Sequence, residues 1–251
     1  MIEIRQVSKS YGDDLVVDGV TLTLPKGGVT SIIGPNGAGK STLMSMISRL
    51  LPASAGEISV DGLDVAQTKG DVLARRLSIL RQDNHLTARL TVRDLVGFGR
   101  YPYSKNRPTP EDREHIDRAL EFLDLTPLAG RFLDELSGGQ RQRAFVAMVL
   151  CQDTEYALFD EPLNNLDMRQ AAAMMRILRQ AADRVGKTIV LVLHDINFAS
   201  CHSDYIVAMK DGRIAFQGTP NDVMQEGVLT SIFGTQISIH EIDGRRIGVF
   251  Y

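Results

Sequence analysis

The chain has 251 residues, a formal net charge of −3, 43% hydrophobic residues and 24% charged residues, which is the balance of an ordinary folded domain. The length suits one large α/β domain or two small ones, and the slightly negative charge argues against nucleic acid as a partner, because proteins that bind it usually carry a basic face. No apolar run is long enough to span a membrane, and the first residues lack the apolar core of a signal peptide, so we expect neither feature.

Three segments near the N-terminus predict a small antiparallel sheet, because apolar and polar side chains alternate in each as in half-exposed strands. They are Ile2–Val7, Val16–Leu24 and Gly56–Gly62. Tyr11 lies at the turn that follows the first of these strands. Its ring is placed either to stack on an adenine base or to pack on its own sheet, and position alone does not decide between the two.

The strongest motif is a phosphate-binding loop of the pattern G-x-x-x-x-G-K-[ST], made of Gly34, Pro35, Asn36, Gly37, Ala38, Gly39, Lys40, Ser41 and Thr42. A buried strand over 29–33 comes before it, and a helical pattern follows until Pro52 ends it. Glycines let successive backbone N–H groups point at phosphate oxygens. Lys40 is expected to reach the β- and γ-phosphates, and the Ser41 hydroxyl is expected to hold Mg²⁺.

A second strand is predicted over Leu77–Gln82. Gln82 ends it with a carbonyl oxygen for Mg²⁺ or the attacking water, although a surface glutamine is the commoner outcome. The chain then becomes helical: a capping box at Thr91 begins one helix, which the segment from Gly99 to Tyr103 is expected to end. Thr109 as N-cap, with Pro110 at the first helical position, begins a second helix. Arg100, Tyr101 and Tyr103 are candidates for a partner contact, with ordinary loop packing as the alternative.

The segment Ser137-Gly138-Gly139-Gln140 forms another capping box at the start of a helix. Two glycines in a first turn cost helix stability, so we expect the bare backbone to be approached closely by another group. A helix N-terminus with free N–H groups favours anions. The chain therefore has two candidate phosphate-binding helix ends, which two copies arranged head to tail would bring to the same nucleotide.

Two further strands carry polar residues at their ends. The strand over 156–160 ends in Asp160, which is placed to hold Mg²⁺, and Glu161 follows as a candidate general base. The strand over 188–193 is followed by His194, a candidate contact to the γ-phosphate, because open α/β sheets bind ligands at the carboxyl ends of their strands. Beyond it, a terminal hairpin is predicted from Ile237–Ile242 and Ile247–Tyr251, with packing or dimer contact as its expected role. Cys151 and Cys201 are isolated, so we expect both to pack in a reducing compartment.

Taken together, these motifs resemble those of the ATP-binding cassette (ABC) ATPases over essentially the whole chain. The resemblance assigns family roles to these residues: Tyr11 as the aromatic loop, Gln82 as the Gln loop, Leu136 to Gln140 as the signature, Asp160 and Glu161 as the Walker B pair, Asp167 as the D-loop aspartate and His194 as the switch histidine.

The resemblance implies an α/β fold with a P-loop core around a mostly parallel sheet, an antiparallel β subdomain and an α-helical subdomain. It implies one domain over 1–251, with the core in 1–82 and 146–251 and the helical part in 83–145. The cofactors would be ATP and Mg²⁺, the metal held by Ser41, Gln82 and Asp160, and catalysis would fall to Lys40, Gln82, Glu161 and His194. Two copies would enclose two ATP molecules.

A finer resemblance is to importer ATPases for ferric siderophores, haem and cobalamin, and it is nearest to ferric-siderophore uptake. The segments that carry it are 90–96, 99–103, 161–167 and 194–197. It implies permease subunits as partners, a substrate-binding protein as an indirect partner, and a peripheral place on the cytoplasmic side of the inner membrane. Tyr156 and Asn164-Asn165 depart from the commonest pattern. A soluble ABC ATPase of repair, translation or signalling is the alternative, without the inserted coiled coil or second cassette usual there.

Overall fold

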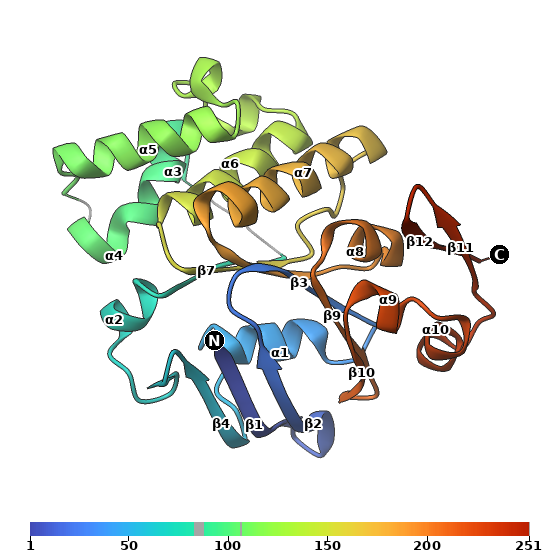
Figure 1. Ribbon diagram of the computed structural model, residues 1–251. Coiled ribbons are helices and arrows are strands. Elements are labelled where there is room, and N and C mark those ends of the chain that lie inside the picture. Colours follow the sequence, from blue (N-terminus) through green and yellow to red (C-terminus); the bar gives the residue numbers. More distant parts are fainter. Residues whose placement is uncertain (83–87, 106, 251) are drawn as a thin grey trace.

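The computed structural model describes residues 1–82, 88–105 and 107–250, in which two sheets and a set of helices surround the phosphate-binding loop (Figure 1). The larger sheet has six strands in the order β10-β9-β3-β8-β7-β6, all parallel except β10. Its strands are β3 (Gly28–Ile33), β6 (Leu77–Leu80), β7 (Tyr156–Asp160), β8 (Thr188–Val192), β9 (Tyr205–Lys210) and β10 (Arg213–Gly218). The mostly parallel sheet predicted from the sequence is therefore confirmed.

The smaller sheet is antiparallel, in the order β2-β1-β4-β5. Its strands are β1 (Ile2–Tyr11), β2 (Asp14–Leu24), β4 (Ala55–Val60) and β5 (Leu63–Asp64). The helix α1 (Lys40–Ile47) lies between the two sheets (Figure 1). Alternate residues of the large sheet face opposite sides: Ile32 packs with α1 and the small sheet, whereas Ile33 packs with the helices on the other face. Both faces are covered, which explains why its strands are apolar throughout.

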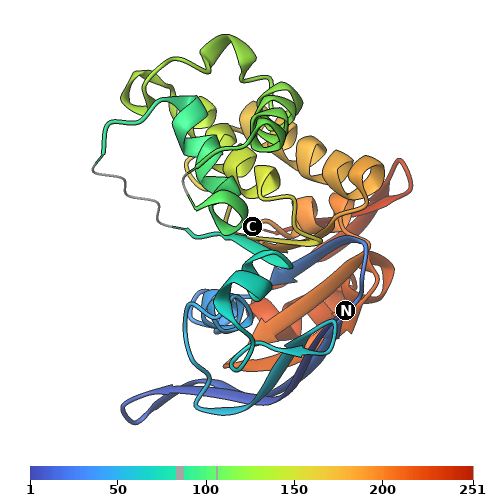
Figure 2. The ribbon, with the colours of Figure 1, turned by 90° about the vertical axis from the view of Figure 1, so that its left-hand side faces the viewer.

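The far face of the large sheet is covered by α6 (Gly138–Cys151) and α7 (Met168–Val185), and α3 (Val92–Gly97) and α5 (Pro110–Phe122) pack on α6. Figure 2 shows these helices stacked on one side of the molecule. The shorter helices are α2 (Gly70–Ala74), α4 (Tyr101–Ser104), α8 (Ile196–His202), α9 (Pro220–Val223) and α10 (Glu226–Phe233). The strands β11 (Ser238–Ile242) and β12 (Arg245–Val249) form the predicted terminal hairpin; Tyr251 lies outside the described residues.

Two predicted helix ends differ from the structure. The helix α1 ends at Ile47 rather than at Pro52, because Arg49 has a positive φ of 58° that a helix does not tolerate. The segment 99–103 does not end helical structure after α3; it continues as a 3₁₀ turn over Phe98–Arg100 and as α4. Within the part of the chain that the structure describes, no helix combines the length and the apolarity that crossing a membrane requires.

Candidate active site

The loop between β3 and α1 has the shape that its glycines were expected to permit. Gly34 and Gly39 have φ values of 145° and 91°, which are left-handed values that favour glycine. Space demands glycine as well: a Cβ on Gly34 would lie 2.1 Å from the Met209 carbonyl oxygen, and one on Gly39 would lie 2.7 Å from that of Val16. The loop is therefore pressed against β9 and β2, so both positions are closed to any side chain.

Lys40 begins α1 and is nearly buried, with 5% of its surface exposed. Its ammonium donates hydrogen bonds to the carbonyl oxygens of Gly34 at 2.9 Å and Pro35 at 2.8 Å. Burial lowers the pKa of Lys40, while the nearby carboxylates of Glu161 and Asp160 act in the opposite direction. Within the described residues, this charge is held by hydrogen bonds to loop carbonyls, which a phosphate can replace.

Ser41 and Asp160 meet beside the loop, where the Ser41 hydroxyl donates to Asp160 Oδ1 at 2.9 Å. Asp160 is the last residue of β7 and is 6% exposed. Burial raises the pKa of Asp160, and the hydrogen bond from Ser41 lowers it in part. A hydroxyl and a carboxylate are the oxygen ligands that Mg²⁺ prefers, and nucleotide phosphates commonly complete such a site. The donor set therefore fits this metal.

Glu161 makes polar contacts with three other residues of the site. Gln82, after β6, donates through Nε2 to its Oε2 at 2.7 Å, and Nε2 of His194, after β8, lies 2.6 Å from its Oε1. Asn164, three residues further on, also donates to Oε2. The Glu161 side chain is only 8% exposed. Because the Gln82 amide nitrogen is used here, the carbonyl oxygen of that side chain stays available for a metal.

Asn164 is a site residue that the sequence reasoning did not identify; it was noted there only as a departure from the commonest D-loop. The backbone explains the contact, because Glu161 and Asn165 both have positive φ values, 53° and 61°, which turn the chain back on itself. An asparagine three residues after a strand-end acid was the available signal.

The signature segment begins α6 as predicted. Ser137 Oγ accepts from the Gln140 N–H at 3.4 Å, and the Ser137 N–H donates to Gln140 Oε1 at 3.0 Å. The two glycines differ: a Cβ on Gly138 would meet open space, whereas one on Gly139 would lie 2.4 Å from Oε1 of Gln170. Close approach to Gly139 is thus already made by α7, and only Gly138 leaves its backbone open.

The signature shares a hollow of about 420 Å³ with the start of α7. Asp167 caps α7 there by accepting from the Gln170 N–H at 2.8 Å. The hydrogen bonds of Ser137 and Gln140 stay within their own segment, whereas the loop residues Lys40 and Ser41 bond to the loop and to Asp160. The structure thus groups the predicted residues into a phosphate and carboxylate cluster and a separate signature cluster.

Two predicted aromatic positions have different outcomes. Tyr11 ends β1 and is 51% exposed, with the Lys9 ammonium 5.5 Å from its ring centroid, so its ring has an open face. For Arg100 the structure shows ordinary packing, the alternative to a partner contact, because Arg100 is 4% exposed. Its Nε donates to Asp112 Oδ1 at 2.8 Å, and its guanidinium lies 3.9 Å from the centroid of the Tyr103 ring. Of these neighbours only Tyr101, 54% exposed, is open to a partner.

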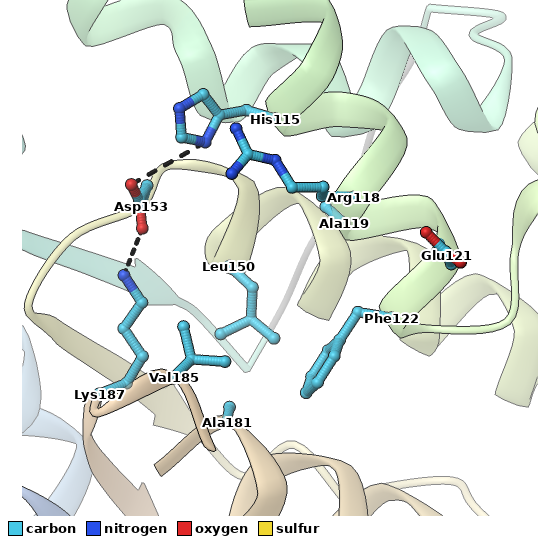
Figure 3. A pocket seen from close by; sticks show the side chains of 10 residues that line it. All are labelled: His115, Arg118, Ala119, Glu121, Phe122, Leu150, Asp153, Ala181, Val185 and Lys187. Atoms are coloured by element: carbon cyan, nitrogen blue, oxygen red, sulfur yellow. Dashed lines mark hydrogen bonds and ion pairs between the residues drawn. The ribbon is translucent and has the colours of Figure 1, made fainter. Parts of the chain in front are cut away.

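A second hollow, of about 370 Å³, lies between α5, the ends of α6 and α7, and the start of β8 (Figure 3). Phe122, Leu150 and Val185 give it an apolar lining. At its rim Asp153 Oδ1 accepts from the Lys187 ammonium at 2.5 Å, and His115 Nδ1 lies 3.9 Å from Oδ2. Because β8 begins here and ends at the active site, this hollow lies at the opposite edge of the sheet from the phosphate loop.

A glycine-rich cradle between a strand and a helix, with a buried lysine and two acids at the end of a neighbouring strand, defines a P-loop nucleoside triphosphatase. A family model described as "ABC transporter" matches residues 17–164. The chain belongs to the ABC transporter family of ATP-binding proteins, and it is an ATPase that uses ATP.

Similar proteins agree with this family over nearly the whole chain. The petrobactin import ATP-binding protein YclP of Bacillus subtilis (strain 168) is 51% identical over 251 residues, which is all of both chains. The petrobactin import ATP-binding protein FatE of Bacillus anthracis is 57% identical over 239 residues, covering 95% of this chain and 96% of that one. Among solved structures, the dimeric bacterial ABC transporter cassette MJ0796 has a TM-score of 0.77 at 30% identity, covering 88% and 99%.

Proposed function

We propose that this chain is the ATP-hydrolysing subunit of a bacterial importer that powers uptake of ferric siderophores across the cytoplasmic membrane. The observation that carries the proposal is the position of Glu161 among Gln82, His194 and the Ser41–Asp160 pair, beside a complete phosphate loop. The choice of cargo is supported by the two petrobactin import proteins, which match this chain almost end to end. Haem and cobalamin are the alternative cargoes.

Each residue of the cluster has a separate role in hydrolysis. The loop from Gly34 to Thr42 cradles the phosphates with its N–H groups, and Lys40 turns from its carbonyls to the β- and γ-phosphates. Ser41, Asp160 and Gln82 would hold Mg²⁺, which neutralises charge on the phosphates. Glu161 takes a proton from the attacking water as general base. His194, now beside Glu161, is the contact to the γ-phosphate.

The nucleotide is completed by a second copy of the chain. Ser137, Gly138, Gly139 and Gln140 of the partner copy close over the γ-phosphate, and Tyr11 stacks on the adenine. The separate location of the signature cluster within one chain supports this arrangement, as does the similarity to a cassette that is described as dimeric. Two ATP molecules are then enclosed between two head-to-tail copies.

The remaining partners follow from the role in import. We propose contact with integral-membrane permease subunits and indirectly with a substrate-binding protein, from a peripheral position on the cytoplasmic side of the inner membrane, with no nucleic acid involved. We assign 1–251 to one domain, with the core in 1–82 and 146–251 and a helical subdomain in 83–145, whose first residues lie outside the described ranges. The helix α6 crosses that boundary and joins the two parts.

The test is reconstitution of the full chain with its permease and binding protein in lipid vesicles. We expect ATP-dependent uptake of ferric petrobactin that exceeds uptake of haem and cobalamin, and we expect the Glu161→Gln protein to support none. The matched control is Asp183→Asn, an exposed pair partner of Arg179 on α7, which should transport normally. ATP hydrolysis with preferential uptake of haem or cobalamin would overturn the cargo, whereas assembly with DNA or ribosomes instead of a permease would overturn the role.

A further inference from the structure

The C-terminal hairpin β11–β12 packs on α8, the helix that begins two residues after His194 (Figure 1). The contact is a paired set of hydrogen bonds: Asn197 Nδ2 donates to the Gly248 carbonyl oxygen at 3.1 Å, and Asn197 Oδ1 accepts from the Gly248 N–H at 2.8 Å. One turn later, Ser200 Oγ donates to the Arg246 carbonyl oxygen at 2.6 Å. Two polar residues one turn apart on α8, Asn197 and Ser200, are thus hydrogen-bonded to the backbone of β12.

The hairpin and α8 are also closely packed at Gly248. Gly248 is buried, and a Cβ on it would lie 2.7 Å from Cδ1 of Ile196 and 3.3 Å from Cγ2 of Ile237. Ile196 is 4% exposed and belongs to the main core. The hairpin therefore approaches the first turn of α8 closely at Gly248, where a larger residue would require Ile196 to shift.

The hairpin is itself anchored on its other side. Glu226, at the start of α10, accepts from the Ile239 N–H at 3.1 Å, and the Arg246 guanidinium donates to the Asn221 carbonyl oxygen at 2.9 Å. The hairpin thus connects α8 to the segment α9–α10 that follows β10. A strand fixed at both sides can hold a helix end more rigidly than a free terminus would.

We propose that the C-terminal hairpin is a positioning element for the switch histidine, acting through Asn197. Only Asp195 and Ile196 lie between Asn197 and His194 in the chain, and Asp195 is engaged as the cap of α8, accepting from the N–H groups of Asn197 and Phe198. The orientation of the His194 loop is therefore set by where the first turn of α8 sits, and the Asn197–Gly248 pair fixes that turn. The inference rests on the proposed role of His194 in hydrolysis.

The first test is steady-state ATP hydrolysis by the full-length Asn197→Ala protein. We expect kcat to fall about tenfold with KM for ATP unchanged, because a small misplacement of a catalytic group lowers the rate while the phosphate loop stays intact. The Asn197→Asp protein keeps the hydrogen bond from the Gly248 N–H. Its kcat should lie between those of the unmodified protein and the Asn197→Ala protein. Arg93→Ala, which breaks an exposed ion pair with Asp117 and touches neither the hairpin nor α8, is the control and should keep normal kcat.

A double-mutant cycle with His194→Ala separates positioning from general stability. We expect Asn197→Ala to have no further effect on kcat in the His194→Ala background, whereas a structural effect would lower kcat in both. The inference would be overturned if Asn197→Ala lowered kcat by the same factor in the unmodified and the His194→Ala background. It would also be overturned if Asn197→Ala alone had a normal kcat. A normal kcat for His194→Ala alone would instead overturn the proposed role of His194, and with it the basis for the hairpin's role.

Discussion

The amide of Gln82 donates a 2.7 Å hydrogen bond to the carboxylate of Glu161, although the two residues are 79 positions apart in the chain. They meet because β6 and β7 are neighbouring parallel strands that end at the same edge of the sheet. Along the chain, Gln82 lies between β6 and the helix α3. The proposed general base is therefore in direct contact with the point where the chain leaves the core for its helices.

Replacing Glu161 by Gln removes the proton acceptor and keeps the shape. We expect ATP binding to persist while turnover falls by about 10² to 10⁴-fold, the usual contribution of a general base. An ATP-bound dimer should accumulate, which size-exclusion chromatography with ATP would detect. The Asp183→Asn protein serves as the control for a lost exposed carboxylate. Turnover close to that of the unmodified protein would show that Glu161 is not the base.

Ser137→Arg places a large cation at the signature and should block hydrolysis without affecting binding of a nucleotide to the phosphate loop of the same chain. The Lys40→Ala protein should have a damaged phosphate loop and an intact signature. If each site is shared between two copies, a mixture of the two inactive proteins regains activity, because each mixed dimer contains one undamaged site. The measurement is ATPase rate against mixing ratio; a rate that never exceeds the average of the two separate proteins would rule out shared sites.

The buried pair of Arg100 and Asp112 gives a prediction for stability. Removing one partner with Arg100→Ala leaves an uncompensated buried carboxylate and should lower the free energy of unfolding by about 3 kcal/mol. Chemical denaturation measures this change. Arg93→Ala is the matched control, because its pair with Asp117 is exposed and should contribute little. A loss no greater than that of the control would contradict the structural role of Arg100.

The same pair predicts a pH dependence with a definite sign. Burial alone raises the pKa of Asp112, but hydrogen bonds from Thr109 and Arg100 outweigh it and lower the pKa to about 2, against about 3.9 in an unfolded chain. A carboxyl whose folded pKa is depressed stabilises the protein fully above the unfolded value, and this contribution is lost as the pH falls toward the folded value. The stability difference between the unmodified and Asp112→Asn proteins should therefore shrink from pH 5 to pH 2; a constant difference would exclude this linkage.

Tyr101 and Tyr103 should behave differently although they are two residues apart. Tyr101 is exposed, so Tyr101→Ala should weaken assembly with the permease by about 1 to 2 kcal/mol, as for an aromatic interface residue, and leave the melting temperature unchanged. Tyr103 covers the Arg100 guanidinium, so Tyr103→Ala should lower the melting temperature instead. Co-purification with the permease and thermal unfolding of both proteins would check this; undisturbed assembly of Tyr101→Ala would contradict the contact.

Much of the fold was predictable because its signals are local. Capping boxes at Thr91 and Ser137 begin α3 and α6 as expected, and the N-cap Thr109 begins α5, since a cap involves only residues up to three positions apart. The burial of Arg100 was not predictable, because its partner Asp112 lies on another helix and the pairing depends on how the two helices pack. The contact of Asn164 with Glu161 was missed for a related reason: the spacing of the two residues was visible in the sequence, but the positive φ values that turn the chain back were not.

The close fit of Gly139 against Gln170 joins the start of α6 to the first turn of α7. Asp167 caps that same turn of α7. The start of α6 and Asp167 therefore lie on one hollow rather than in separate parts of the surface. A neighbouring copy that contacts the start of α6 would therefore contact the start of α7 as well. A substitution at Gly139 or Gln170 would change the spacing between these two helix ends.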